Sequence, residues 1–335
     1  MKYETFSHYT IYVLICQGKR SNKENTKNRY TFNGFSAKML PENNIKDSFF
    51  MKISTEINSS AKYIGERKAV ELVAKAGFDA WDLSMFRMVN YDWVARKCEP
   101  SDHPLAGGGY VGFVKELRKI GEDNGITCNQ SHAPFPSISP EIRDYFKRAI
   151  ECTAIAGGKI CVIHPCNDLS ADENAEMFEE FLPFAKSHGV KIATENMWNW
   201  NDKENCASPA ACSDAKSFCN HIKAVNDDYL VACLDIGHAE MRGLNTSAVE
   251  MIEALGDNLQ ALHIHDNDRR HDSHQIPYSM DIEFSPIIRA LKKINYGGYF
   301  TLEADQYIKS AEESEQKLKD LAAVARKMAK EFESL

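Results

Sequence analysis

The 335-residue chain lacks the features that mark membrane proteins and disulfide-rich or zinc-knuckle proteins. No apolar run approaches the ~18 residues that a membrane-spanning helix needs, so no membrane partner is expected. No two of its ten cysteines have C-x-x-C spacing, and intervals such as that from Cys161 to Cys166 fit neither a zinc knuckle nor a small disulfide scaffold. The cysteine pattern therefore predicts free thiols and a cytoplasmic location.

An excess of positive charge is also absent. The formal net charge is −8, and residues 1–50 hold eight Lys and Arg against four Asp and Glu, which leaves −12 on residues 51–335. Proteins that bind nucleic acid need basic surfaces to contact the phosphate backbone. The acidic charge of residues 51–335 therefore disfavours a nucleic-acid partner.

Hydrophobic periodicity is missing from the first part of the chain. Residues 17–50 are polar and rich in lysine, and a regular strand pattern begins only at Met51. Segments of this composition cannot bury enough apolar surface to fold. We expect residues 1–50 to be a disordered or non-native extension and residues 51–335 to form the folded domain.

From Met51 onward, short apolar runs alternate with amphipathic segments. The apolar runs predict eight strands, at 52–57, 79–85, 126–133, 159–165, 190–196, 229–238, 259–267 and 298–305. The amphipathic segments predict helices at 65–77, 110–125, 141–156, 173–188, 212–225, 247–256, 284–294 and 310–333.

This alternation predicts a closed (β/α)8 TIM barrel. Strands rich in Val, Ile, Leu and Cys and separated by helices are typical of a parallel sheet that is buried on both faces. Eight strand–helix units favour a barrel over an open doubly wound sheet. No glycine-rich phosphate loop follows the first strand, which further disfavours a dinucleotide-binding fold.

Polar, titratable residues interrupt the apolar strands near their carboxyl ends. They are Ser131 and His132, His164, Glu195 and Asn196, Asp235 and His238, His263 and His265, and Glu303 and Asp305. The carboxyl ends of barrel strands meet at one mouth, where barrel enzymes build their active sites. Six successive strands are therefore expected to bring these side chains into one small volume.

A shared metal site explains this set better than separate structural roles do. A single histidine at a strand end more often makes a structural hydrogen bond, so His132 or His164 alone indicates little. Glu195 and Glu303 are harder to dismiss, because a carboxylate buried after an apolar strand is costly unless it is paired or bound to metal. Carboxylate and imidazole ligands together suit Mn, Co, Mg, Zn or Fe.

In this order, the motifs SHAP, VIHP, TEN, LDIGH, HIHDND, DSH and LEAD resemble those of the xylose isomerase-like barrel superfamily, over about residues 51–333. The superfamily includes sugar phosphate isomerases/epimerases, ketose 3-epimerases and endonuclease IV. The resemblance to ketose 3-epimerases implies one divalent metal held by Glu195, Asp235, His265 and Glu303. It also implies that His238 binds substrate.

The endonuclease IV pattern implies a site with three zinc ions instead. All nine ligand types of that pattern have a counterpart here, so His132, His164, His238, Asp272 and His274 are candidate ligands of additional metal ions. The sequence departs from many relatives at residues 277–282, where a turn with two glycines is replaced by PYSMDI.

The strand at 259–267 carries two histidines, His263 and His265, and we expect them to have different roles. Alternation along a strand points both into the barrel and turns Ile264 toward the helices. We expect His265, nearer the mouth, to bind metal, and His263, one layer deeper, to support the ligands.

The resemblance and the chemistry together predict a sugar or sugar phosphate isomerase/epimerase. Glu195 and Glu303 would act as acid and base on an enediolate, while the metal polarises the substrate carbonyl. Candidate residues for binding a small carbohydrate are His132, His164, His238, Trp198 and Arg269, with Arg270, Trp200, Trp81 and Phe86 as further candidates.

Other functions remain open alternatives. They are a zinc phosphodiesterase of the endonuclease IV type, a lyase or dehydratase that uses the same enediolate chemistry, and a non-catalytic sugar-binding barrel. A homo-oligomer is compatible with each of them.

Overall fold

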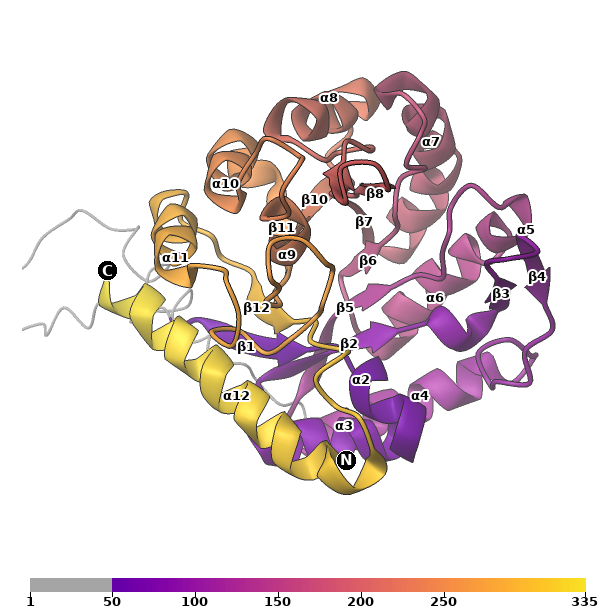
Figure 1. Ribbon diagram of the computed structural model, residues 1–335. Helices are drawn as coiled ribbons and strands as arrows, with labels where there is room; N and C mark the ends of the chain where they lie inside the picture. The colour runs from indigo at the N-terminus through magenta and orange to yellow at the C-terminus, as the bar shows by residue number, and fades with distance from the viewer. Residues whose placement is uncertain (1–49) are drawn as a thin grey trace, which may run out of the picture. The chain divides into compact units, whose positions relative to one another are not determined.

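The computed structural model describes residues 50–335, which form one compact unit of strands and helices. The predicted extension over residues 1–50 lies outside the described residues, apart from Phe50. Figure 1 shows a ring of strands at the centre of the unit and helices around it. No helix in the described part of the chain is long and apolar enough to cross a membrane. The nine cysteines found there are all free.

The ring consists of eight parallel strands. They are β1 (Lys52–Thr55), β2 (Ala80–Ser84), β5 (Thr127–His132), β6 (Ile160–Val162), β7 (Lys191–Glu195), β10 (Leu230–Asp235), β11 (Leu259–His263) and β12 (Tyr299–Leu302). Six of them form one sheet in the order β11-β10-β7-β6-β5-β2, and β1 pairs with β12.

Backbone hydrogen bonds join these two sheets and close the barrel. The amide of Asp79 donates to the carbonyl of Ile53 at 3.0 Å, which connects β2 to β1. On the other side, the amide of Ile264 donates to the carbonyl of Thr301 at 2.9 Å, which connects β11 to β12. The predicted (β/α)8 barrel is therefore confirmed.

Eight helices alternate with these strands, close to the predicted positions. They are α3 (Glu66–Ala76), α4 (Tyr110–Asp123), α6 (Phe146–Ala156), α7 (Ala171–His188), α8 (Ala215–Val225), α10 (Ala248–Leu255), α11 (Phe284–Lys293) and α12 (Ala311–Ser334). Local signals fix several helix ends. Ser170 and Glu173 form a capping box at the start of α7, and α3 ends at Gly77 in the left-handed conformation, with φ 98°.

The apolar core has two parts, as the two-residue period of strands requires. The larger part fills the space between strands and helices and includes Ile264, which is 1% exposed on the helix side as predicted. The smaller part lies inside the barrel and consists of Val162, Ala193, Val231, Cys233 and Ala261. These small side chains fill the barrel below the titratable residues at its mouth.

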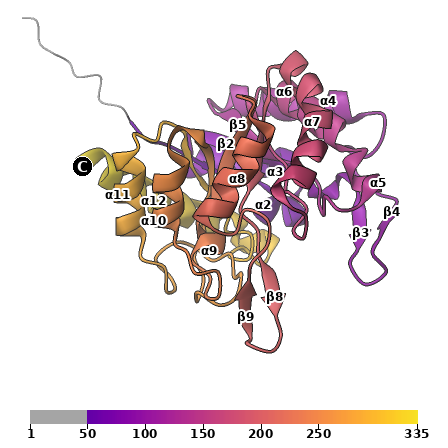
Figure 2. The same cartoon turned by 90° about the horizontal axis from the view of Figure 1, so that it is seen from above.

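Short elements that the sequence patterns did not predict as separate units lie between the barrel strands and the main helices. They are the helices α2 (Asn58–Ile64), α5 (Pro140–Arg143) and α9 (Ile236–Ala239), the 3-10 turns η1 (Phe86–Met88) and η2 (Gly256–Asn258), and two hairpins, β3 (Asn90–Asp92) with β4 (Lys97–Glu99) and β8 (Asn199–Asn201) with β9 (Cys206–Ser208). The helix predicted at 141–156 is divided into α5 and α6. Figure 2 shows both hairpins projecting from the same face of the barrel. Strands of three residues are too short to show a two-residue period, so hydrophobic patterning could not find them.

The strand predicted at 229–238 ends earlier than expected, at Asp235. The Asp235 carboxylate accepts a hydrogen bond of 2.7 Å from the amide of His238, which caps α9 and turns the chain out of the strand. His238 is therefore presented by a helix and not by the barrel strand.

Candidate metal centre and active site

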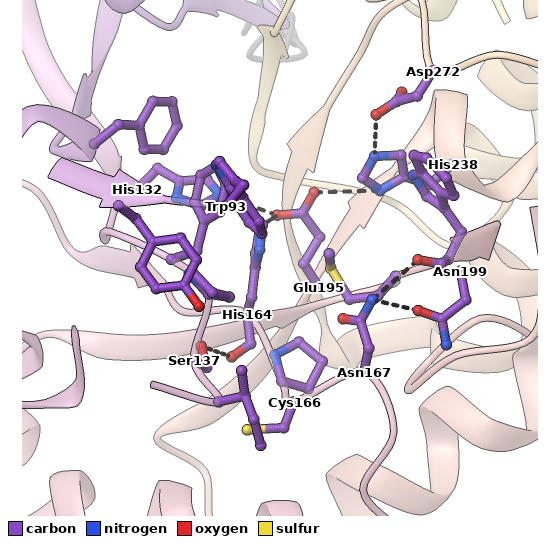
Figure 3. Close-up of a pocket in the computed structure, with 18 of the residues that line it drawn as sticks. Trp93, His132, Ser137, His164, Cys166, Asn167, Glu195, Asn199, His238 and Asp272 are labelled. Atoms are coloured by element: carbon purple, nitrogen blue, oxygen red, sulfur yellow. Dashed lines mark hydrogen bonds and ion pairs between the residues drawn. The ribbon is translucent and has the colours of Figure 1, made fainter. Parts of the chain in front are cut away.

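A cavity of about 710 Å³ opens at the carboxyl ends of the strands. Both hairpins contribute to its walls, through residues such as Tyr91 and Trp93 on one and Asn199 on the other. The histidines and carboxylates that line it are His132, His164, Asp168, Glu195, His238, Asp272, His274, Glu303 and Asp305. In Figure 3, Glu195 points into this cavity between His132 and His164 on one side and His238 on the other.

The central group of potential metal ligands consists of Glu195, Asp235, His263 and Glu303. One ligand atom from each lies within 4.8 Å of the others. Nδ1 of His263 is 3.2 Å from Oε2 of Glu195 and 3.3 Å from Oε2 of Glu303. All four side chains are buried, with Glu303 the most exposed at 7%.

A second group surrounds Glu195 on the side of β5 and β6. The Nε2 atoms of His132 and His164 are 2.8 Å apart, and Nε2 of His164 is 3.3 Å from Oε2 of Glu195. His132, Glu195 and His263 also offer ligand atoms within 4.8 Å of one another. Glu195 therefore belongs to both groups.

A third group lies on the other side of Asp235 and consists of His238, His265, Asp272 and His274. Oδ2 of Asp272 is 3.2 Å from Nε2 of both His238 and His274. Nε2 of His265 is 3.4 Å from Oδ1 of Asp272 and 3.1 Å from Oδ1 of Asp235. The structure thus brings all the predicted ligands to one end of the barrel, in three adjoining groups.

The two histidines of the HIHDND motif belong to different groups. The resemblance to ketose 3-epimerases implies that His265 joins Glu195, Asp235 and Glu303, whereas His263 is the histidine that contacts the two glutamates. The strand register explains this, because His263 pairs with Asp235 across β10 and β11. His265 lies two residues beyond the strand and reaches the third group.

Backbone carbonyls orient four of the histidines in the same way. Each can donate its Nδ1–H to a carbonyl oxygen: His132 to Ala133 at 2.8 Å, His238 to Asn196 at 2.9 Å, His274 to Glu303 at 2.8 Å and His265 to Asp266 at 3.4 Å. In that tautomer Nε2 carries the lone pair and faces the carboxylates. This arrangement is typical of histidines that bind metal.

The donor set fits a divalent cation. Several buried polar atoms have no hydrogen-bond partner among the described residues, namely Oε2 of Glu195, Oδ2 of Asp235, Nδ1 of His263, Nε2 of His265 and Oδ1 of Asp272. Burial lowers the pKa of His238, but the charges of Asp235 and Asp272 outweigh burial and raise it to about 10. Such a concentration of buried negative charge is stabilised by a cation with oxygen and imidazole ligands.

The environments of the two central glutamates drive their pKa values in opposite directions. Burial alone would raise the pKa of Glu195, but the charge of His263 and the close approach of its histidine neighbours bring it well below its usual range. Burial raises the pKa of Glu303 well above its usual range, because it outweighs the opposing charge of His263. The surroundings thus favour the charged form of Glu195 and the neutral form of Glu303.

The predicted sugar-binding residues are only partly brought together. Trp198 and Phe86 line the cavity, as do His132, His164 and His238. Arg269 does not line it, because its guanidinium forms an ion pair of 2.8 Å with Glu240.

The other aromatic and basic candidates also point elsewhere. Trp81 is fully buried in the core, which rules out sugar stacking there. Trp200 stacks on His271, with ring centroids 5.8 Å apart, and Arg270 donates to the carbonyl of Asn205 at 2.9 Å.

Sequence reasoning missed two buried carboxylates that organise the site. Asp82 in β2 is fully buried, and its Oδ2 is 3.5 Å from Nε2 of His263. Asp266 accepts hydrogen bonds from the amides of Ser279, Met280 and Ile282, which shapes the loop that contains the PYSMDI segment. The sequence does carry a signal for Asp82, because a single aspartate within a strand that is otherwise apolar indicates a buried carboxylate with a specific role.

The model of the xylose isomerase-like TIM barrel family matches residues 70–328. The chain belongs to this family. Among curated proteins, it is similar to the uncharacterised protein MJ1311 of Methanocaldococcus jannaschii, at 25% identity over 85% of this chain and 99% of the relative.

Solved structures share the fold. One, described as a D-tagatose 3-epimerase-like protein, aligns with a TM-score of 0.60 at 22% identity over 83% of this chain and 99% of its own. Another is the 3-keto-D-glucoside 4-epimerase YcjR of E. coli, with a TM-score of 0.61 at 17% identity over the same shares of the two chains.

Proposed function

We propose that this protein is a divalent metal-dependent sugar isomerase or epimerase. The observation that carries the proposal is the pair Glu195 and Glu303, which approach Nδ1 of His263 to 3.2 and 3.3 Å and have pKa values shifted in opposite directions. Paired titratable groups whose pKa values are driven apart are typical of an acid and a base in one site. The names of the two structural neighbours agree with this chemistry.

Glu195, Asp235, His263 and Glu303 would hold the metal of this reaction. A divalent cation bound there, such as Mn, Co, Mg or Zn, supplies Lewis acidity to the carbonyl and hydroxyl oxygens of a sugar. The resemblance to ketose 3-epimerases implies His265 in this set, and we propose His263 in its place because its Nδ1 lies 3.2 Å from Glu195 and 3.3 Å from Glu303.

The protein side chains would then move the protons. Ionised Glu195 removes the proton from the carbon beside the substrate carbonyl, and the electron pair of the broken C–H bond forms the enediolate. Protonated Glu303 returns a proton to the opposite face of that carbon or to its neighbour, which gives the epimer or the isomer. His132, His164 and His238 line the cavity around Glu195 and would orient the substrate hydroxyl groups.

The test replaces each glutamate with its uncharged isostere. Glu195→Gln and Glu303→Gln should each slow exchange of the substrate α-proton in D2O about 10²–10⁴-fold, because each removes one proton-transfer group. The exchange is measured by NMR over a panel of ketoses and ketose phosphates. Glu204→Gln, on the exposed loop between β8 and β9, is the control and should retain full activity. Near-normal turnover by either site variant contradicts the assignment.

A second candidate function is a phosphodiesterase with three metal ions. It is favoured by the three adjoining ligand groups and by the four histidines whose Nε2 atoms face carboxylates. Against it, Arg96 is the one Lys or Arg that lines the cavity in the described part of the chain, and residues 51–335 are acidic. Three zinc ions per chain together with cleavage of abasic DNA would favour the phosphodiesterase, whereas one metal ion with sugar turnover favours the epimerase.

A further inference from the structure

The outer half of the cavity is lined mainly by aromatic side chains, whereas its floor holds the histidines and carboxylates of the ligand groups. Four aromatic side chains line the outer half, Phe86, Tyr91, Trp93 and Phe135, and we call them the outer aromatic wall. The wall begins at the ligand groups, where the rings of Phe86 and His132 are 4.8 Å apart. It continues outward through Phe135, 5.1 Å from Phe86 and 6.1 Å from Trp93, and ends at Tyr91, 5.0 Å from Trp93.

Specific hydrogen bonds hold this wall in place. At the tip of the β3–β4 hairpin, Oδ1 of Asp92 accepts from the amides of Val94 and Ala95, both at 2.9 Å. In β4, the amide of Cys98 donates to Glu141 of α5 at 3.3 Å. This bond holds the hairpin against α5, the helix that follows the loop with Phe135.

The rim of the wall exposes apolar surface at the cavity mouth. Trp93 is 61% exposed and Ile138, which also lines the cavity, is 56% exposed. Exposed apolar side chains beside a polar cleft are typical of a surface that a ligand covers. Figure 3 places Trp93 on the His132 side of the cavity.

We propose that the outer aromatic wall binds the second ring of a glycoside, so that the substrate is a keto-disaccharide or an aryl glycoside of a keto sugar. This inference rests on the proposed function. The C–H face of a pyranose is apolar and stacks on aromatic rings, which bury large areas at little entropic cost. The cavity of about 710 Å³ lies within the range of roughly 300–1,000 Å³ that is typical of pockets for drug-sized ligands, which are larger than one hexose of about twelve non-hydrogen atoms.

A phosphate is the competing occupant, because Arg96 lines the same part of the cavity. Phosphate groups are commonly bound by several cationic or backbone N–H donors. Among the described lining residues, Arg96 is the single guanidinium, against the four rings of the outer aromatic wall. The composition of the wall therefore favours a second ring.

The experiment compares ketoses with keto-disaccharides. D-fructose and D-tagatose are matched with isomaltulose, turanose and lactulose, and α-proton exchange and equilibrium binding are both measured with the metal-loaded protein. Trp93→Ala should lower kcat/KM and affinity for the disaccharides about five- to tenfold, as expected for loss of one stacking contact. It should change the values for the monosaccharides less than about twofold. Trp200→Ala, an exposed tryptophan that does not line the cavity, is the matched control.

Each outcome separates this inference from the proposed function. Equal effects of Trp93→Ala on both classes of sugar, or the absence of saturable disaccharide binding, overturn the second-ring site. The same is true if inorganic phosphate competes with substrate and only Arg96→Ala weakens binding. Disaccharide binding that depends on Trp93, without any α-proton exchange, supports the second-ring site and contradicts the epimerase.

Discussion

At the scale of single residues, Asp82 is the side chain whose role follows most directly from its position. It is fully buried, and neither of its carboxylate oxygens has a hydrogen-bond partner among the described residues. Its nearest polar neighbour is Nε2 of His263, at 3.5 Å, while Nδ1 of the same ring faces Glu195 and Glu303. A carboxylate behind a metal-binding histidine fixes the ring and raises its basicity.

Asp82→Asn should therefore weaken divalent metal binding about 10–100-fold, because the amide cannot replace the negative charge behind the imidazole. Competition with a chromophoric chelator measures the affinity without reference to activity. Asp102→Asn changes an exposed aspartate and should leave the affinity unchanged. Unchanged affinity in Asp82→Asn would show that the contact with His263 is structural only.

At the scale of elements, the short helix α9 holds the third ligand group against the barrel. A Cβ atom added at Gly237 would lie 1.9 Å from Cε1 of the His265 ring. The absence of a side chain at Gly237 therefore lets α9 pack against the His265 ring. The side-chain amide of Asn267 donates a hydrogen bond of 2.9 Å to the carbonyl of Gly237, and this bond connects α9 to the loop after β11.

Gly237→Ala should destabilise the protein by about 1–3 kcal/mol, the usual cost of overpacking a buried site. Urea unfolding measures the loss. Gly112→Ala in α4 is the matched control, since a Cβ at Gly112 meets no atom within 4 Å and alanine favours a helix by roughly 0.5–1 kcal/mol. Equal stability of the two variants would mean that His265 moves aside without cost.

The length of a helix or strand also determines whether the sequence alone can predict it. The eight barrel strands and their helices are predictable, because buried parallel strands are continuous apolar runs and the helices are long enough to show their period. The convergence of His132, Glu195 and Glu303 then follows from the barrel alone. The two hairpins and α9 are too short for such signals, so the outer aromatic wall and the placement of His238 require the structure.

Which of two neighbouring residues enters the site depends on contacts with residues far away in the sequence. Alternation correctly directs His263 and His265 to the same side of β11. Which of them faces Glu195 depends on the register with β10, where Asp235 pairs with His263. In the same way, Arg269 is directed away from the cavity by Glu240, a residue almost thirty positions earlier in the chain.

At the scale of the whole molecule, the ligand groups connect distant parts of the barrel. Asp82 comes from β2, Glu195 from β7, Asp235 from β10 and His263 from β11, while Glu303 directly follows β12. Their carboxylates lie buried close together, so their mutual repulsion opposes closure of the barrel. A cation that binds only the folded chain offsets this repulsion and couples metal binding to global stability.

Metal should therefore raise the free energy of unfolding by about 2.7 kcal/mol at a free concentration 100 times its dissociation constant. For a domain of this size, with an unfolding entropy of about 2.1 cal/mol/K per residue, that corresponds to an increase in Tm of roughly 4–5 °C. Differential scanning fluorimetry after EDTA treatment, and again after addition of Mn, Co, Mg or Zn, measures the shift. Asp235→Asn removes a proposed ligand and should abolish most of it, whereas Asp102→Asn should preserve it. A Tm that none of these metals changes would contradict a resident metal, because a cation bound by side chains from four strands cannot leave the stability of the barrel unaffected.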